Sequence, residues 1–386
     1  MKVDFYRHPL DRSAADAVGE VLASGFLTTG RVSAAVEAQL CQYFDVPHAI
    51  LTSSWTSGAM AALMAMGVGP GDEVVVPAMT FVATANIAEL LGASAVLVDV
   101  DPETLLMTPQ AVAAAITERT RAVIPVHLYG QMCDIAGIRA MVDAAERAGG
   151  RRIYLVEDCA HCFEGTRDGE RPGRHSDIAA FSFYATKNVT CGEGGAVIFR
   201  DSDLYRLTLE TRLHGMTAAA VDRFAGGRYN HWDIERLGLK ANLPDLLAAL
   251  LPEQIRTIDA RLGERHELVE RYRNALAGGP VRLVADDPAC RSAHHLFTIG
   301  VPGPDRDLAI ARLNEAGIGI TVNYRALPDL AYYGRRYPQA RARCPQAVLW
   351  GRQTLSLPLF PGLTRAEQDH VIESVQRHVY PLAGAP

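Results

Sequence analysis

The chain has 386 residues, of which 48% are hydrophobic and 21% charged, with a formal net charge of −6. This length exceeds what one core usually supports, so two domains are expected in an ordinary globular protein. The acidic balance argues against a general nucleic-acid-binding surface, which needs a basic face. The N-terminal residues hold no apolar run, so we expect no secretory signal and no membrane span. A cytoplasmic location follows, with the seven cysteines reduced.

Residues 36–199 alternate short apolar runs with segments of helical period. This alternation is typical of an α/β layer built on a mostly parallel sheet. Thr108-Pro109 predicts a capped helix start with proline at the first helical position. In chain order we expect strand 73–77, helix 80–91, strand 94–100, helix 109–117 and strands 121–126, 153–156, 179–183 and 196–199.

The character of the chain changes after about residue 243, which indicates a smaller α+β unit. We place a large domain at residues 1–245 and a small C-terminal domain at residues 246–386. The elements expected in the second part are amphipathic helices over 243–277, strand 295–301, helix 306–316, strand 318–322 and a terminal helix from about 364.

Two polar residues follow neighbouring expected strands. Asp158 comes after strand 153–156, and Lys187 comes after strand 179–183. In open α/β sheets, ligands bind outside the carboxyl ends of the strands. Gly192, Gly194 and Gly195 then permit a tight return into the next strand.

A hydroxyl-rich segment, Thr-Ser-Ser-Trp-Thr-Ser-Gly at 52–58, opens an expected helix. Such a helix start is suited to bind an anion, because its N–H groups are free. Phe81, further along, could stack on a planar ring. Each feature alone is common in proteins without any such site. Their joint order favours pyridoxal 5′-phosphate (PLP), which needs a lysine for its aldehyde, a carboxylate beside its ring nitrogen and donors for its phosphate.

Motifs over nearly the whole chain resemble the DegT/DnrJ/EryC1/StrS sugar aminotransferases. The similar segments include Pro-Gly-Asp-Glu-Val at 70–74, Thr-Phe-Val-Ala-Thr at 80–84, Ile-Pro-Val-His-Leu-Tyr-Gly at 124–130, Val-Glu-Asp at 156–158, Phe-Ser-Phe at 181–183 and Gly-Glu-Gly-Gly at 192–195. The runs at 187–195 and 356–361 look closest to UDP-4-amino-4-deoxy-L-arabinose–oxoglutarate aminotransferases. The resemblance implies the type I (aspartate aminotransferase) fold of PLP-dependent transferases, with a large mostly parallel sheet domain and a smaller C-terminal α+β domain.

The resemblance also implies residue roles and partners. Lys187 would form the Schiff base and move protons, and Asp158 would pair with the pyridine nitrogen. An amino group from L-glutamate would pass to a keto group of a nucleotide-linked deoxy sugar, with a 4-keto sugar favoured. A homodimer with shared active sites is implied as well. The remaining cofactor contacts would come from His161, Ser182, Thr56, Trp55, Phe81 and Asn242, and weaker candidates for the substrate are Glu193, His214, Tyr129 and Arg325.

At two places the sequence departs from the family pattern, so the identity of the sugar substrate does not follow from the resemblance. Trp55 stands where relatives usually have Gly or Ala, and the segment 323–326 matches the nearest subgroup only loosely. The alternative functions are an aminotransferase acting on a cyclitol ketone and a non-catalytic regulatory member of the fold. Cys159 and Cys162 raise a metal or redox alternative, but a zinc site needs three or four ligands and usually a second paired motif. We therefore expect no metal.

Overall fold

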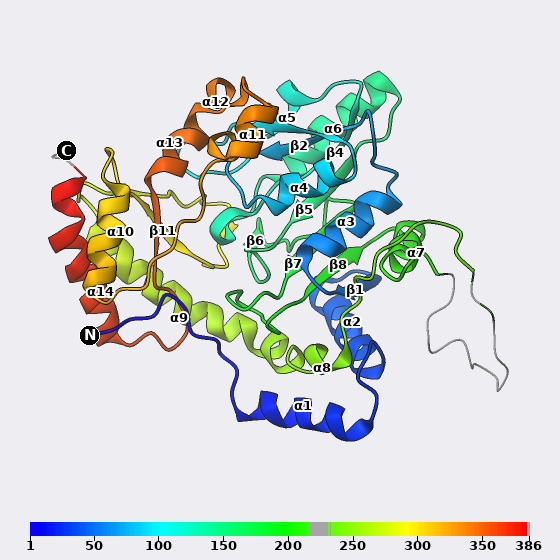
Figure 1. The fold of residues 1–386 in the computed structure, drawn as a ribbon, viewed down its shortest axis with the longest axis horizontal. Helices are drawn as coiled ribbons and strands as arrows, with labels where there is room; N and C mark the ends of the chain where they lie inside the picture. Colours follow the sequence, from blue (N-terminus) through cyan, green and yellow to red (C-terminus); the bar gives the residue numbers. More distant parts are fainter. Residues whose placement is uncertain (217–230, 232, 384–386) are drawn as a thin grey trace.

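The structure, a computed structural model, describes residues 1–216, 231 and 233–383 (Figure 1). Its main feature is a seven-stranded sheet in the order β1-β8-β7-β5-β4-β2-β3. All strands of this sheet run parallel except β8, which is antiparallel to both of its neighbours. The strands are β1 (His48–Thr52), β2 (Glu73–Pro77), β3 (Ser94–Val98), β4 (Thr120–Val123), β5 (Tyr154–Asp158), β7 (Ile178–Ser182) and β8 (Gly195–Phe199). The prediction of a mostly parallel α/β sheet is confirmed.

Alternate residues along the strands enter two different apolar layers. On β7, Ile178 and Ala180 join one cluster of buried residues, whereas Ala179 and Phe181 join another. This is the two-residue period of a strand that is buried on both faces. The helices that cover the sheet are α2 (Arg31–Phe44), α3 (Trp55–Ala65), α4 (Ala83–Leu90), α5 (Pro109–Ala115), α6 (Ile135–Gly149) and α7 (Ser202–Thr211), while α1 (Arg12–Ser24) lies at the periphery (Figure 1).

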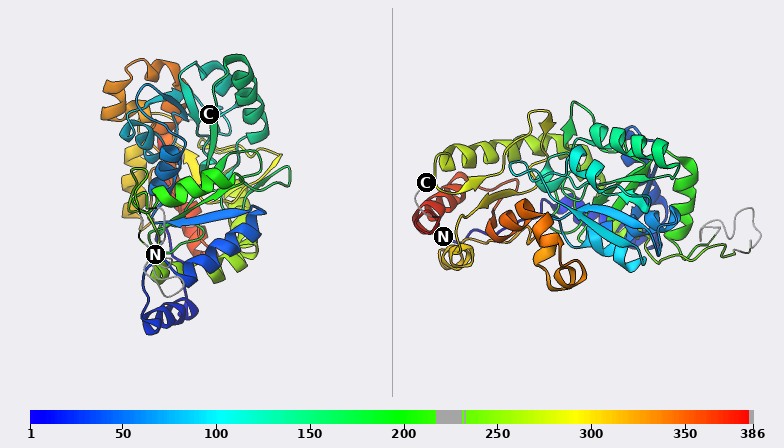
Figure 2. Two further views of the ribbon diagram at one scale, coloured as in Figure 1. Left: turned by 90° about the vertical axis from the view of Figure 1, so that its right-hand side faces the viewer. Right: turned by 90° about the horizontal axis from the view of Figure 1, so that it is seen from above.

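A second unit surrounds a three-stranded sheet in the order β12-β11-β9. The long helix α9 (Pro252–Leu276) runs from the large sheet toward this unit (Figures 1 and 2). Its first half packs in the core of the large sheet through Ile255 and Ile258, and its second half packs in the core of the small unit. The short helix α8 (Asp245–Ala248) packs against α1 and α2 on the large-sheet side. The elements that follow α9 in the chain include β9 (Arg282–Leu283), β11 (Phe297–Gly300), α10 (Arg306–Glu315), α11 (Ala331–Arg336), α12 (Ala340–Arg343), α13 (Pro345–Gln353), β12 (Thr354–Leu357) and α14 (Arg365–His378). A separate antiparallel pair is formed by β6 (Thr166–Arg167), which follows β5 in the chain, and β10 (Cys290–Arg291), which precedes β11.

One expected strand is wrong. Residues 318–322 form no ladder and make only isolated bridges, from Ile318 to Val3 and from Thr321 to Ser356. The N-terminal segment supplies the missing partner, because Gly319 N–H donates to Val3 O at 2.8 Å and Val3 N–H donates to Gly317 O at 2.8 Å. The apolar pattern of residues 318–322 predicts an extended segment, but it does not show that the N-terminal segment pairs with it. The division at residue 245 stays a prediction, and residues 326–350 send Leu327, Tyr333 and Trp350 into the core of the large sheet.

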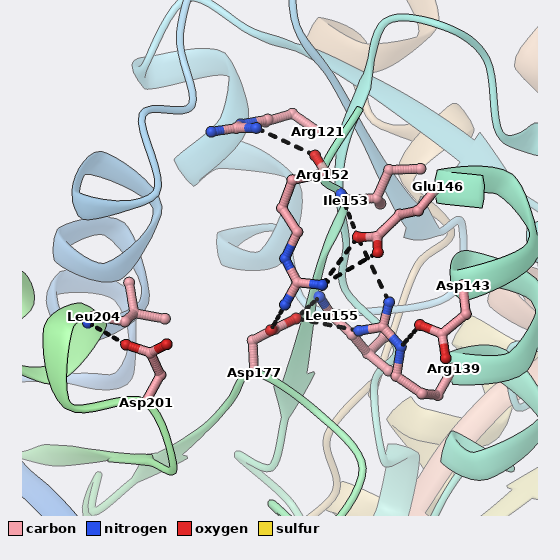
Figure 3. A network of polar contacts seen from close by, with 10 residues as sticks. All are labelled: Arg121, Arg139, Asp143, Glu146, Arg152, Ile153, Leu155, Asp177, Asp201 and Leu204. Atoms are coloured by element: carbon pink, nitrogen blue, oxygen red, sulfur yellow. Dashed lines mark hydrogen bonds and ion pairs between the residues drawn. The ribbon is translucent and has the colours of Figure 1, made fainter. Parts of the chain in front are cut away.

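Polar contacts hold the amino-terminal ends of β5 and β7 together (Figure 3). Asp177, directly before β7, accepts a hydrogen bond from Leu155 N–H of β5 at 2.7 Å and pairs with Arg152 and Arg139. Glu146 of α6 accepts from Ile153 N–H at 2.7 Å. These contacts fix the register of the two strands at their amino-terminal ends. The carboxyl-terminal ends of β5 and β7 are therefore also held side by side.

Candidate active site

A cavity of about 570 Å³ lies at the carboxyl ends of β5 and β7. It is lined by residues from the large sheet domain together with Phe5, Thr321, Asn323 and Tyr324. A volume of this size is that of a typical small-molecule or cofactor site. Eight of the residues singled out from sequence line it, namely Trp55, Thr56, Phe81, Asp158, His161, Ser182, Lys187 and Glu193.

Lys187 lies in the turn that follows β7, with its side chain partly buried at the cavity wall. Burial lowers the pKa of its amine to about 8, against the opposing charge of Asp158. Its Nζ lies 3.5 Å from Nε2 of His295. No carboxylate among the described residues forms an ion pair with it. An amine whose pKa is near 8 has a sizeable neutral fraction at physiological pH and can act as a nucleophile.

Asp158 ends β5 and is 4% exposed. Thr84 donates a hydrogen bond to its Oδ2 at 2.9 Å, and Ala160 N–H donates to its Oδ1 at 3.1 Å. Burial raises the pKa of this carboxyl to about 6, although both hydrogen bonds and the charge of Lys187 act in the opposite direction. Within the described part of the chain it has no cationic partner at ion-pair distance. A buried carboxylate facing a cavity without such a partner fits a ligand that brings its own positive charge.

The start of α3 forms another wall. Ser54 is the N-cap, and its side chain and that of Ser57 satisfy each other's backbone in a capping box. Among the described residues, no acceptor is hydrogen-bonded to the N–H groups of Trp55 and Thr56. Gly195 permits this approach, because a Cβ there would lie 2.5 Å from the Trp55 nitrogen. Free N–H groups at a helix start, beside the hydroxyls of Thr56 and Ser182, form a site that suits a phosphate.

Aromatic side chains border the space between these walls. Phe81 is 54% exposed, and its ring centroid lies 5.5 Å from that of Tyr324. His161 Nδ1 accepts from Tyr129 N–H at 3.2 Å, so its Nε2 carries the hydrogen and lies 2.9 Å from the Tyr324 hydroxyl. Burial lowers the pKa of His161 well below its usual range, which keeps this ring neutral.

Four of the sequence candidates do not line the cavity. Tyr129 is buried behind it and donates its hydroxyl to Asn323 O. Asn242 pairs with Thr52 of β1 and donates to Thr29 at 2.6 Å. Arg325 donates to Asp329 O at 2.8 Å, and exposed His214 bonds Leu239 O through its backbone. Of these four residues, Tyr129 donates a hydrogen bond to a residue of the cavity wall, Asn323.

Several residues that the sequence reasoning left out are part of this site. Thr84 contacts Asp158, Tyr324 lines the cavity, and His295 contacts Lys187. Thr84 carried a signal, since it lies in the 80–84 motif at the start of a helix. His295 carried none, because it precedes a strand more than a hundred residues from Lys187.

A second buried cluster contains possible metal ligands, His127, Glu157 and Cys159. His127 Nδ1 accepts from Cys133 N–H at 3.1 Å, so its Nε2 carries the hydrogen that Glu157 Oε2 accepts at 2.8 Å. Both ring nitrogens are thereby used within the protein. His127 therefore has no free lone pair with which to bind a metal, and we interpret the cluster as a structural hydrogen-bond network.

Comparison with known proteins agrees with the geometry. Residues 9–376 match the model of the DegT/DnrJ/EryC1/StrS aminotransferase family. Spr1654 of Streptococcus pneumoniae, which bears the name of a sugar aminotransferase and has been solved in a PMP form, is 30% identical with a TM-score of 0.90 over 99% of both chains. DesV of S. venezuelae is 32% identical with a TM-score of 0.84, covering 94% of this chain and 93% of its own. The sugar aminotransferase CalS13 of Micromonospora echinospora is 28% identical with a TM-score of 0.87, covering 97% of this chain and 99% of its own.

The cavity therefore has the groups that PLP requires, and Spr1654 is also known in a PLP form. No helix in the described ranges combines the length and apolar character needed to cross a membrane. The family model matches nearly the whole chain, and the solved sugar aminotransferases share its type I fold. The chain belongs to the DegT/DnrJ/EryC1/StrS aminotransferase family and is a PLP-dependent sugar aminotransferase.

Proposed function

We propose that this enzyme transfers an amino group from L-glutamate to a keto group of a nucleotide-linked deoxy sugar, with a 4-keto sugar favoured. The observation that carries the chemistry is the pair at the cavity wall. Lys187 is an amine with a pKa near 8, and Asp158 is a buried carboxylate without a cationic partner in the described residues. The sugar and the donor rest on the family resemblance.

PLP, when bound, supplies an electron-withdrawing ring that stabilises negative charge on the carbon losing its proton. Lys187 would hold the aldehyde carbon of the cofactor and, when released by the donor, would move a proton between donor and cofactor carbons through Nζ. Asp158 would keep the ring nitrogen protonated. Phe81 would cover one ring face, and His161 would contact the phenolic oxygen.

The phosphate would be held at the start of α3. The hydroxyls of Thr56 and Ser182 and the N–H of Trp55 would share its charge. This position fixes one end of the cofactor, while Asp158 fixes the other. A cofactor held at both ends presents its reactive carbon to Lys187 in one orientation.

The choice of a lysine at 187 stands out in this chain. It contains only 3 lysines, at positions 2, 187 and 240, against 35 arginines. An arginine keeps its proton in proteins and cannot act as a neutral amine nucleophile. The chain thus retains a lysine where the proposed chemistry requires one.

The family resemblance also supports a homodimer with shared active sites. Asn242 would reach the phosphate in the partner's site, and Glu193, His214, Tyr129 and Arg325 would act on the substrate side. Among these, Glu193 lines the cavity of its own chain. Sedimentation analysis of the holoenzyme tests the dimer.

The function is tested with purified holoenzyme, L-glutamate and a panel of nucleotide-linked keto sugars, by measuring 2-oxoglutarate and the amino sugar. We expect turnover with a 4-keto sugar. Lys187→Ala and Lys187→Arg should both abolish turnover and the absorbance of the Schiff base between lysine and cofactor, whereas exposed Lys2→Arg should match the wild type. Turnover only with a cyclitol ketone would overturn the sugar proposal, and full activity of Lys187→Ala would overturn the residue assignment.

A further inference from the structure

The amine of Lys187 has a neighbour that the proposed mechanism does not use. His295 is 6% exposed, and its Nε2 lies 3.5 Å from Lys187 Nζ. The histidine precedes β11 of the small sheet, and its N–H donates to Tyr129 O at 3.0 Å. Gly130 permits this close approach, because a Cβ there would lie 3.1 Å from the His295 nitrogen. The ring therefore has a fixed position beside the lysine.

A buried polar chain fixes the hydrogen positions of this ring. Asn188 Nδ2 donates to Glu164 Oε1 at 2.8 Å and to Ala293 O at 2.9 Å. Neither acceptor can donate in return, so both amide hydrogens are used and Oδ1 is left to face His295 Nδ1 at 3.2 Å. Because Oδ1 only accepts, Nδ1 must carry the hydrogen. The neutral ring then presents a bare Nε2 to Lys187.

The far end of this chain is anchored by a charge. Arg265 of α9 is 1% exposed and forms an ion pair with Glu164, which is fully buried. Its Nε also donates to Ala293 O at 3.2 Å. Glu164 therefore stays an acceptor for Asn188, and the orientation of the asparagine amide follows from it.

We propose that His295 accepts a hydrogen bond from the Lys187 amine and thereby sets the protonation and direction of that amine. The inference rests on the proposed role of Lys187 and adds to it a residue from the small sheet's side of the cavity. Arg265, Glu164 and Asn188 act as positioning residues, because they reach the amine only through the ring.

The ring accepts a hydrogen bond without taking the proton. Burial lowers the pKa of His295 well below its ordinary range, and the charges of Lys187 and Arg265 lower it further. Among the described residues, Asp158 of β5 and His161 also interact with the charge of the amine, and the His161 ring centroid lies 4.4 Å from that of His295. The remaining titratable side chains of the cavity wall are Tyr184, Glu193 and Tyr324. Asp158 favours the ammonium form, and His295 does so through its lone pair. Removal of this lone pair should therefore lower the pKa of Lys187.

The scarcity of lysine allows a direct measurement. In cofactor-free protein, the acetylation of Lys187 is followed against pH by peptide mass spectrometry, with Lys2, whose side chain is 85% exposed, as internal reference. His295→Phe keeps a flat ring and removes the acceptor, so the midpoint for Lys187 should fall by about one pH unit. His295→Gln restores an acceptor and should recover most of the shift. Asn188→Ala removes the acceptor that holds the hydrogen on Nδ1 of His295, so the midpoint should fall by a smaller amount.

The matched control is His266→Phe, an exposed histidine of α9 that contacts His294 at 3.2 Å and lies outside the cavity wall. In this variant, the acetylation midpoint of Lys187 should equal that in the wild type. An unchanged midpoint in folded His295→Phe would overturn the inference, and if that variant does not fold, an unchanged midpoint in Asn188→Ala would do so. Loss of turnover in Lys187→Ala together with an unchanged midpoint in the His295 variants would leave the proposed function standing and reject only this inference.

Discussion

Glu157 and Asp158 are neighbours on β5, and both are buried, at 1% and 4% exposed. Successive residues of a strand point to opposite faces, so the two carboxylates have different surroundings. Glu157 accepts from His127, Ser176 and Gly173 N–H. Among the described residues, the carboxylate of Asp158 accepts from the Thr84 hydroxyl and from Ala160 N–H, and it faces the cavity. Burial alone does not distinguish the two residues. The number of hydrogen-bond donors to each carboxylate and the cavity beside Asp158 distinguish a structural carboxylate from one that can bind a ligand.

The largest effect on catalysis is expected from Asp158→Asn. The amide has the same shape but cannot keep the cofactor ring protonated, so turnover should fall at least about 100-fold. Steady-state rates with a fixed amino donor measure this loss. Activity near that of the wild type would contradict the role of Asp158.

The same substitution should stabilise the cofactor-free protein. The pKa of Asp158 is about 6 when folded, above the value of about 3.9 for an unfolded chain. The ionised form is therefore disfavoured by folding, and this cost is absent below about pH 4, grows as pH rises to 6 and is complete at neutral pH. Asp158→Asn should raise the free energy of unfolding at pH 7.5 by up to about 3 kcal/mol. Urea denaturation at pH 4 and pH 7.5 tests the sign, since the gain should vanish at the lower pH.

Glu157→Gln should have the opposite effect. Its amide nitrogen would face donors that now bond a carboxylate, and we expect a loss of about 2 kcal/mol in the free energy of unfolding. The folded fraction should keep its cofactor and its kcat. Exposed Glu315→Gln is the matched control, and the contrast between the two carboxylates would fail if Glu157→Gln lost turnover while remaining fully stable.

The smallest effect is expected from Thr84→Val, which keeps the shape of the side chain and removes one donor to Asp158. The pKa of Asp158 should rise, and cofactor affinity should fall by about fivefold, corresponding to about 1 kcal/mol. Thr84→Ser keeps the hydroxyl and should bind as the wild type does. Titration of cofactor-free protein with PLP, followed by absorbance, measures the difference.

Most of the large sheet could be predicted from sequence because its strands are short apolar runs bounded by turn residues. Strand 73–77 has the expected bounds, and Pro109 opens a helix as expected. β1 and β12 were not predicted, and strand 318–322 was wrong because its backbone pairs with the N-terminal segment. Such pairings join residues that are distant in sequence, and local patterns do not contain that information.

The sequence by itself determined the family, the cofactor and the positions of Lys187 and Asp158, because strand ends and motif spacing are local properties of the chain. Only the tertiary structure decided which of two adjacent buried carboxylates faces the cavity, and that His295 lies beside the lysine amine. Both outcomes depend on which neighbours satisfy each polar group. In a folded chain, those neighbours come from elements that are distant in sequence.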